Sequence, residues 1–237
     1  MEQRNRDPKT FYDYIATTYD HRFQGVVSRI ENELATASLS TRNVLDLGCG
    51  TGLYLEYVKP EGYIGIDLSF GMLQVACAKF PTHRFIQSDM SAIPFPDHSF
   101  DAVVSLFGAF SYCLTPHRCV DEIDRVLRPG GRVVVMAYGQ RYITRKSHIA
   151  PMLPFWTYTA RQLRHLFAPI GQVTVSGLNW QIERLPYRWY ARLEHETISR
   201  LCPDACYFLF VEVSKDAQTT VSTECLRRGD LSIEAVV

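Results

Sequence analysis

Short apolar runs that alternate with helical stretches constrain the fold of this chain more than any other feature. Within the first 140 residues the runs that predict strands are 43–47, 63–67, 83–87, 101–106 and 132–137, and the helical stretches are 53–58, 69–79 and 116–127. Near-continuous apolar runs are typical of strands that are buried on both faces. This strand–helix alternation therefore predicts a parallel sheet with right-handed crossovers.

The two ends of the chain show other patterns. The first 40 residues place apolar side chains three and four apart, which predicts helix. In the second half we expect a helix at 159–167, a strand at 172–176, a long helix at 185–201 and a strand at 207–213. A polar tail without clear periodicity follows. No linker of low complexity divides the chain, which favours one domain.

Composition excludes several classes of function. The 25 Lys and Arg residues balance the 25 Asp and Glu residues, whereas nucleic-acid-binding domains usually carry a basic excess, so we expect no nucleic-acid partner. The seven cysteines include no C-x-x-C pair, and the polar N-terminus has no signal peptide, which favours reduced thiols and a cytoplasmic protein. Cys202 and Cys206 lack a second pair, so no metal site is expected. No apolar run reaches the roughly 20 residues of a membrane span.

The stretch VLDLGCGTG, residues 44–52, joins the end of the first predicted strand to a turn that is rich in glycine. Ligands of parallel sheets bind beyond such strand ends. The dinucleotide fingerprint requires G-x-G-x-x-G, but here the spacing is G-x-G-x-G and Leu53 occupies the position of the third glycine. Asp46, beside the turn, suits a cationic ligand group better than a pyrophosphate. Both departures argue against an NAD-dependent oxidoreductase.

Further motifs follow in order, and with them the chain resembles the class I S-adenosylmethionine-dependent methyltransferases, of the small-molecule, methyltransferase type 11-like kind. Besides VLDLGCGTG, the matching motifs are GIDLS (65–69), SDM (88–90), FDAVVSLFGAFSY (100–112) and LRPGG (127–131), the last at the turn before the fifth strand. The resemblance implies an α/β, Rossmann-like fold. Its sheet would be seven-stranded and mostly parallel, in the order 3-2-1-4-5-7-6 with strand 7 antiparallel, and helices would cover both faces.

The resemblance also implies how the single domain, residues 1–237, is organised. An N-terminal helical lid would occupy residues 1–40 and the cofactor-binding half residues 41–140. The acceptor-side half would be residues 141–215, with an inserted helix at 185–201, and a tail at 216–237. That inserted helix would cap the acceptor pocket, form a dimer interface or pack on the sheet, so we expect a monomer or a homodimer.

S-adenosyl-L-methionine is the cofactor that the resemblance implies, with S-adenosyl-L-homocysteine as product. Asp67 would accept hydrogen bonds from the ribose hydroxyls, Asp89 one from the adenine amino group, and Asp46 would orient the turn or meet the amino group of the methionine part. The remaining expected cofactor contacts are Tyr19, Gly48, Cys49, Gly50, Gly52, Leu68, Met72, Met90 and Leu106. The structural alternatives are that Met72 is a core residue and that Asp67 and Asp89 are turn or capping acids.

The segment YDYIATTYD, residues 12–20, resembles a helix that closes over the cofactor in many relatives. Tyr12 and Tyr19 are the candidates to touch the methionine part. The alternative is a helix that only packs on the domain.

The reaction that we expect is an in-line displacement at the sulfonium methyl, with N or O of a small-molecule acceptor as nucleophile. The chain lacks the D/N-P-P-Y/F motif of the amino-methyltransferases that act on DNA adenine or protein glutamine, and the Pro-Cys nucleophile of the cytosine-C5 enzymes. It also lacks the acidic metal cluster of the catechol-type O-methyltransferases. The catalytic residues stay unknown, with His148 and Tyr112 as candidates, and a general base is needed only for a protonated nucleophile. Arg141, Arg145 and Lys146 would either hold an anionic acceptor or form a solvated loop. An alternative function is a cofactor-binding domain without methyl transfer, either a cyclase-like catalyst or a partner subunit. We expect no membrane partner.

Overall fold

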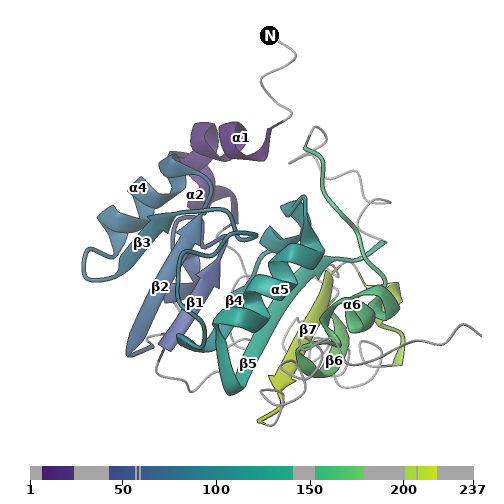
Figure 1. Ribbon diagram of the computed structural model, residues 1–237. Helices are drawn as coiled ribbons and strands as arrows, with labels where there is room; N and C mark the ends of the chain where they lie inside the picture. The colour runs from purple at the N-terminus through teal and green to yellow at the C-terminus, as the bar shows by residue number, and fades with distance from the viewer. Residues whose placement is uncertain are drawn as a thin grey trace, which may run out of the picture.

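The computed structural model describes residues 7–23, 43–56, 58, 60–140, 153–178, 201–206 and 208–217. Seven strands form one sheet in the order β3-β2-β1-β4-β5-β7-β6 (Figure 1). The first five strands pair in parallel, and β7 runs antiparallel to both β5 and β6. The predicted order and the antiparallel seventh strand are therefore confirmed, and the fold is Rossmann-like.

The strands are β1 (Asn43–Leu47), β2 (Gly62–Asp67), β3 (Arg84–Gln87), β4 (Phe100–Ser105), β5 (Leu127–Tyr138), β6 (Gly171–Leu178) and β7 (Phe208–Lys215). The helices are α1 (Pro8–Ile15), α2 (Tyr19–Phe23), α4 (Phe70–Lys79), α5 (Pro116–Val126) and α6 (Ala160–Phe167). Short 3-10 turns are η1 (Ala16–Thr18), η2 (Leu53–Glu56), η3 (Ala109–Tyr112) and η5 (Pro203–Ala205).

Successive residues of the central strands point to opposite faces of the sheet, as pleating requires. Leu45 and Val103 pack in the apolar cluster that includes the inner faces of α5 and α6. Val44 and Val104 pack on the other face, with Tyr54 among others. Because both faces are covered, these strands are apolar at nearly every position.

Side-chain caps begin two of the longer helices, α4 and α6, but not α5. Ser69 caps α4 by accepting a hydrogen bond from the Met72 N–H, and Thr159 forms a capping box with Gln162 at the start of α6. Thr115 occupies the N-cap position of α5, but its side chain makes no capping hydrogen bond. Pro116 at the first helical position has no N–H to satisfy, and its fixed φ favours the start of α5.

Two further expectations are corrected. The helix predicted at 53–58 is the single 3-10 turn η2, because its apolar residues, including Tyr54, are buried in one short turn against the sheet. The turn predicted at LRPGG is an irregular part of β5, in which Leu127 pairs with Phe100 and the register then shifts. Gly130, with a φ of 76°, accommodates this irregularity.

The helices α1 and α2 lie beside α4 at one end of the sheet (Figure 1). Ile15 and Ala16, near the junction of α1 and η1, form a small apolar cluster with Met72 of α4. The parts of the predicted lid at 24–40, of the acceptor-side half at 141–152 and 179–200, and of the tail at 218–237 lie outside the described residues. Within the described helices, none is both long and apolar enough to cross a membrane.

Candidate active site

A cavity of about 390 Å³ opens beyond the carboxyl ends of β1, β2, β3 and β4. This volume lies in the range of roughly 300–1,000 Å³ that is typical of small-molecule sites. Its walls come from the turn after β1, the segments after β2, β3 and β4, and the N-terminal helix α1. The cavity therefore lies at the sheet edge where parallel folds bind ligands.

The turn after β1 depends on backbone conformations that favour glycine. Gly48 and Gly50 have positive φ angles of 71° and 54°. A Cβ on Gly48 would lie 2.5 Å from Ala109 Cβ, whereas a Cβ on Gly50 would meet no atom within 4 Å. Gly48 thus permits close packing against η3, and Gly50 leaves the backbone open to a ligand in the cavity. A Cβ on Gly52 would lie 3.0 Å from the Phe80 ring, and Gly52 is not among the cavity-lining residues.

Asp67 ends β2 at the floor of the cavity. Its Oδ2 accepts a hydrogen bond from the Gly50 N–H and its Oδ1 accepts one from the Ser69 N–H, each at 2.8 Å. Burial raises the pKa of this carboxyl, although the two backbone N–H donors partly oppose that rise. Each carboxylate oxygen keeps a second lone pair for a ligand.

The segment after β3 supplies the other acid. Asp89 is exposed, and its Oδ1 accepts hydrogen bonds from the Ser91 N–H and Oγ–H, both at 2.8 Å. Met90, Leu68 and Met72 also line the cavity. Met72 is at the same time 2% exposed and packed against Ile15, so the two interpretations of this side chain are compatible.

Asp46 is buried beneath the glycine turn rather than among the cavity-lining residues. The Tyr63 hydroxyl donates a hydrogen bond of 2.8 Å to its Oδ2. Burial raises the pKa of Asp46 to about 7, although the hydrogen bond from Tyr63 lowers it. Cys49 lines the cavity, and its thiol has a raised pKa because it too is buried.

Tyr12 and Tyr19 of the N-terminal segment both line the cavity. The Tyr12 ring packs edge-on against Tyr19 and Tyr112, with centroids 6.1 and 5.7 Å apart. Burial is the main cause that raises the pKa of the Tyr12 phenol. Both tyrosines therefore border the cavity, and the closing of this segment over a cofactor stays a prediction.

The segment after β4 forms an aromatic wall that includes Phe107 and Tyr112, with Leu106 and Ala109 beside them. The Tyr112 ring also packs edge-on against Tyr138 and Phe155, with centroids 5.9 and 6.1 Å away. His148 and the basic residues around it lie outside the described residues. The described part of the cavity wall contains no histidine.

Comparison with known proteins decides the family. A family model described as a methyltransferase domain matches residues 45–135. A demethylmenaquinone methyltransferase of Paenarthrobacter aurescens is 32% identical over 185 residues, which cover 73% of this chain and 68% of the relative. The chain belongs to the class I S-adenosylmethionine-dependent methyltransferase family.

Other relatives of this methyltransferase family extend the comparison. A malonyl-[acyl-carrier protein] O-methyltransferase of Marinomonas is 38% identical over 140 residues, or 54% of this chain, which spans about half (50%) of that relative. The solved structure of a possible histamine N-methyltransferase from Thermotoga maritima has a TM-score of 0.67 at 17% identity. That alignment covers 88% of this chain and 99% of the other, and it supports the fold alone.

S-adenosyl-L-methionine is the cofactor of this methyltransferase family, and the site fits it. The open space beside Gly50 leaves room for a ligand to approach the protein backbone. The acids Asp67 and Asp89 offer acceptors to hydroxyl and amino donors and suit a ligand with cationic groups. The cofactor contacts expected from the sequence, apart from Asp46 and Gly52, all line this cavity.

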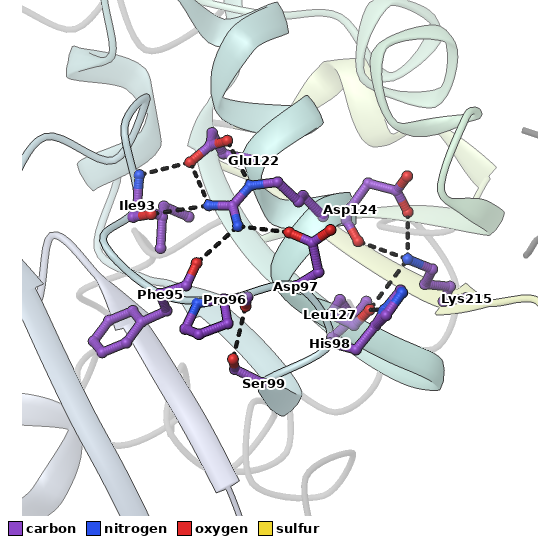
Figure 2. Close-up of polar contacts among 11 residues, drawn as sticks. Ile93, Phe95, Pro96, Asp97, His98, Ser99, Glu122, Asp124, Leu127 and Lys215 are labelled. Carbon is purple, nitrogen blue, oxygen red and sulfur yellow. Dashed lines mark hydrogen bonds and ion pairs between the residues drawn. The ribbon is translucent and has the colours of Figure 1, made fainter. Parts of the chain in front are cut away.

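The methyltransferase also holds the segment after β3 through a clamp that the sequence analysis missed. The Arg125 guanidinium on α5 donates hydrogen bonds to the carbonyls of Ile93 (2.9 Å) and Phe95 (2.7 Å). It also bonds the carboxylates of Glu122 and Asp97, and Glu122 Oε2 accepts the Ile93 N–H at 2.7 Å. Figure 2 shows Ile93, Phe95, Asp97 and Glu122 converging on one guanidinium group. The Glu122-x-x-Arg125 spacing on a predicted helix was the available signal.

Proposed function

We propose that this chain transfers the methyl group of S-adenosyl-L-methionine to N or O of a small-molecule acceptor. The observation that carries this proposal is that one cavity joins an acidic end, with Asp67 and Asp89, to an aromatic wall, with Tyr12, Phe107 and Tyr112. Methyl transfer requires that two reactants be held in line, and a single continuous cavity provides that arrangement.

The acidic end would hold the nucleoside part of the cofactor. Asp67 would accept the ribose O–H groups through the lone pairs that Gly50 and Ser69 leave available. Asp89 would accept the adenine amino N–H through Oδ2, because Oδ1 already accepts the two bonds from Ser91. Leu68 and Met90 would contact the faces of the base. The backbone at Gly50 would lie against the methionine part.

The aromatic wall would exclude water and orient the acceptor. When bound, the cofactor supplies an electrophilic sulfonium methyl, so the protein has to position the nucleophile rather than activate the methyl group. Tyr112 is the described candidate for contact with the nucleophile, beside Tyr12. A protein base is unnecessary when the nucleophile arrives unprotonated.

The test is to incubate the protein with S-adenosyl-L-methionine carrying an isotopically labelled methyl group and a panel of acceptors. The panel includes a demethylmenaquinol, a malonyl thioester and primary amines, because the relatives' names span different acceptor chemistries. We expect S-adenosyl-L-homocysteine to accumulate and the label to appear on N or O of one acceptor by mass spectrometry, whereas a label on a ring carbon of the demethylmenaquinol would contradict an N or O acceptor. If the protein binds the cofactor tightly but methylates none of the acceptors, the result would instead favour a domain that binds the cofactor without transferring methyl.

A further inference from the structure

The N-terminal segment contains two Tyr-Asp pairs, Tyr12-Asp13 and Tyr19-Asp20, spaced seven residues apart. In each pair the tyrosine lines the cavity. In each pair the aspartate accepts a hydrogen bond from a residue next to an expected cofactor contact: Asp13 from Ser69, beside Leu68, and Asp20 from Thr51, beside Gly50. Each pair therefore combines a tyrosine that lines the cavity with an aspartate that anchors the segment.

Asp13 anchors α1 at the ribose end of the cavity. Its Oδ1 accepts hydrogen bonds from the Ser69 hydroxyl (2.6 Å) and the Gly71 N–H (2.8 Å), at the start of α4. Ser69 is also the residue whose N–H donates to Asp67. A Cβ on Gly71 would lie 3.0 Å from Asp13 Cα, so a side chain at position 71 would press against α1.

Asp20 anchors α2 at the glycine turn. Its Oδ1 accepts a hydrogen bond from the Thr51 hydroxyl, and Thr51 is fully buried next to Gly50. Its Oδ2 accepts a bond from Lys79 Nζ at 2.6 Å, and Lys79 also pairs with Glu56 at 2.7 Å. This anchor therefore ties the segment to both η2 and the end of α4.

A small apolar cluster also holds the same segment. Ile15 and Ala16 are buried with Met72, and Phe11, Tyr12 and Tyr19 pack partly buried against them. Segments with few buried contacts open locally at a low free-energy cost, so polar anchors contribute a large share of what keeps them closed. Because Tyr12 and Tyr19 border the cavity, we expect a ligand the size of the cofactor to leave after this segment moves away.

We propose that Asp13 and Asp20 are positioning residues that latch the α1–α2 segment over the cofactor and set the rate at which S-adenosyl-L-homocysteine dissociates. This inference rests on the cofactor placement in the proposed function, but it does not depend on any acceptor. The two latches lie on different helices, Asp13 on α1 and Asp20 on α2, and act on separate partners. Loss of both therefore multiplies the separate effects.

The experiment measures the dissociation rate of radiolabelled S-adenosyl-L-homocysteine by chase with unlabelled compound. We expect Asp20→Ala and Thr51→Val each to accelerate release about tenfold, the effect of losing one hydrogen bond to a charged group. The double variant should release no faster than the faster single variant, since both changes remove the same bond. Thr51→Ser keeps the hydroxyl and should restore the wild-type rate. Asp13→Ala should also accelerate release, and Asp13→Ala with Asp20→Ala should accelerate it about a hundredfold.

Arg128→Gln is the matched control. It removes a partly exposed ion pair with Asp101 at the amino ends of β4 and β5, whereas the cavity lies beyond the carboxyl ends of the strands. Its release rate should equal that of the wild type. Unchanged release in Asp20→Ala and Thr51→Val, or independent effects of these two changes, would overturn the latch. If Asp20→Ala does not fold, the comparison of Thr51→Val with Thr51→Ser still decides, because only Thr51→Val removes the hydroxyl that donates to Asp20. Failure of the wild type to bind S-adenosyl-L-homocysteine would instead contradict the cofactor placement itself.

Discussion

The N–H of Gly50 donates a hydrogen bond of 2.8 Å to Oδ2 of Asp67, across the carboxyl ends of β1 and β2. The bond joins the glycine turn to the acid that ends the neighbouring strand. It fixes both groups on one side of the cavity, although 17 residues separate them in the chain. The bond therefore links the glycine turn directly to the cavity floor.

Asp67→Ala should weaken the binding of S-adenosyl-L-homocysteine by roughly 10- to 100-fold, because hydrogen bonds to a charged acceptor contribute about 1.5–3 kcal/mol. Isothermal titration calorimetry measures the dissociation constant. Asp121→Asn is the matched control, since Asp121 lies exposed on α5 and is not among the cavity-lining residues. An unchanged dissociation constant in Asp67→Ala would remove this carboxylate from the proposed ribose contact.

Asp89→Ala should weaken binding less, by roughly 3- to 10-fold, because water competes for this exposed carboxylate. Asp89→Asn keeps an acceptor oxygen and should bind nearly as well as the wild type. The decisive comparison uses a deaminated ligand, S-inosylhomocysteine, which lacks the adenine amino group. The wild type should discriminate against it and Asp89→Ala should not. Equal discrimination by both proteins would disprove the amino contact.

Arg125→Ala should lower the free energy of unfolding by roughly 1–3 kcal/mol, because the carbonyls of Ile93 and Phe95 lose their donors. Urea denaturation at neutral pH measures this change. Arg125→Lys should be intermediate, since an ammonium cannot reproduce the planar fork of a guanidinium. The cofactor should also bind more weakly to Arg125→Ala, because the clamped segment carries Asp89. A wild-type unfolding midpoint in Arg125→Ala would contradict the clamp.

Asp46 should make the protein lose stability as the pH rises. Its pKa in the folded protein is about 7, against an ordinary value of 3.8, so the folded state retains a proton that the unfolded chain has released. The free energy of unfolding should therefore fall between about pH 4 and pH 7 and level off above that range. The contribution is fully present below the unfolded-state pKa and is lost as the pH passes through the folded-state pKa.

Asp46→Asn should lack this fall, because an amide cannot ionise and still offers an oxygen to the Tyr63 hydroxyl. Between pH 4 and pH 8 the free energy of unfolding of the variant, relative to that of the wild type, should rise by on the order of 4 kcal/mol at most. Urea denaturation across this range measures both curves. The pKa of Asp67 is also raised, but that group is present in both proteins and its contribution cancels to first order. Parallel curves would show that Asp46 stays ionised throughout.

The sequence by itself determined the frame of the site. The apolar run that became β1, the glycines at 48 and 50 and the acid at 67 are local signals, because strand burial and positive φ angles restrict the residue type at each position. The order of the motifs then specified the sheet topology. It also placed the expected contacts after β1, β2 and β3 at one edge.

The tertiary structure decided which side chains meet. No local pattern shows that Asp46 bonds Tyr63, that Asp20 reaches Thr51 or that Gly52 turns toward Phe80. No local pattern shows the length of η2 either. Its apolar residues predicted a longer helix, but in the structure they are buried in a single turn. Each of these outcomes depends on distances between segments far apart in the chain. Those distances exist only once the sheet has formed and its faces have been covered.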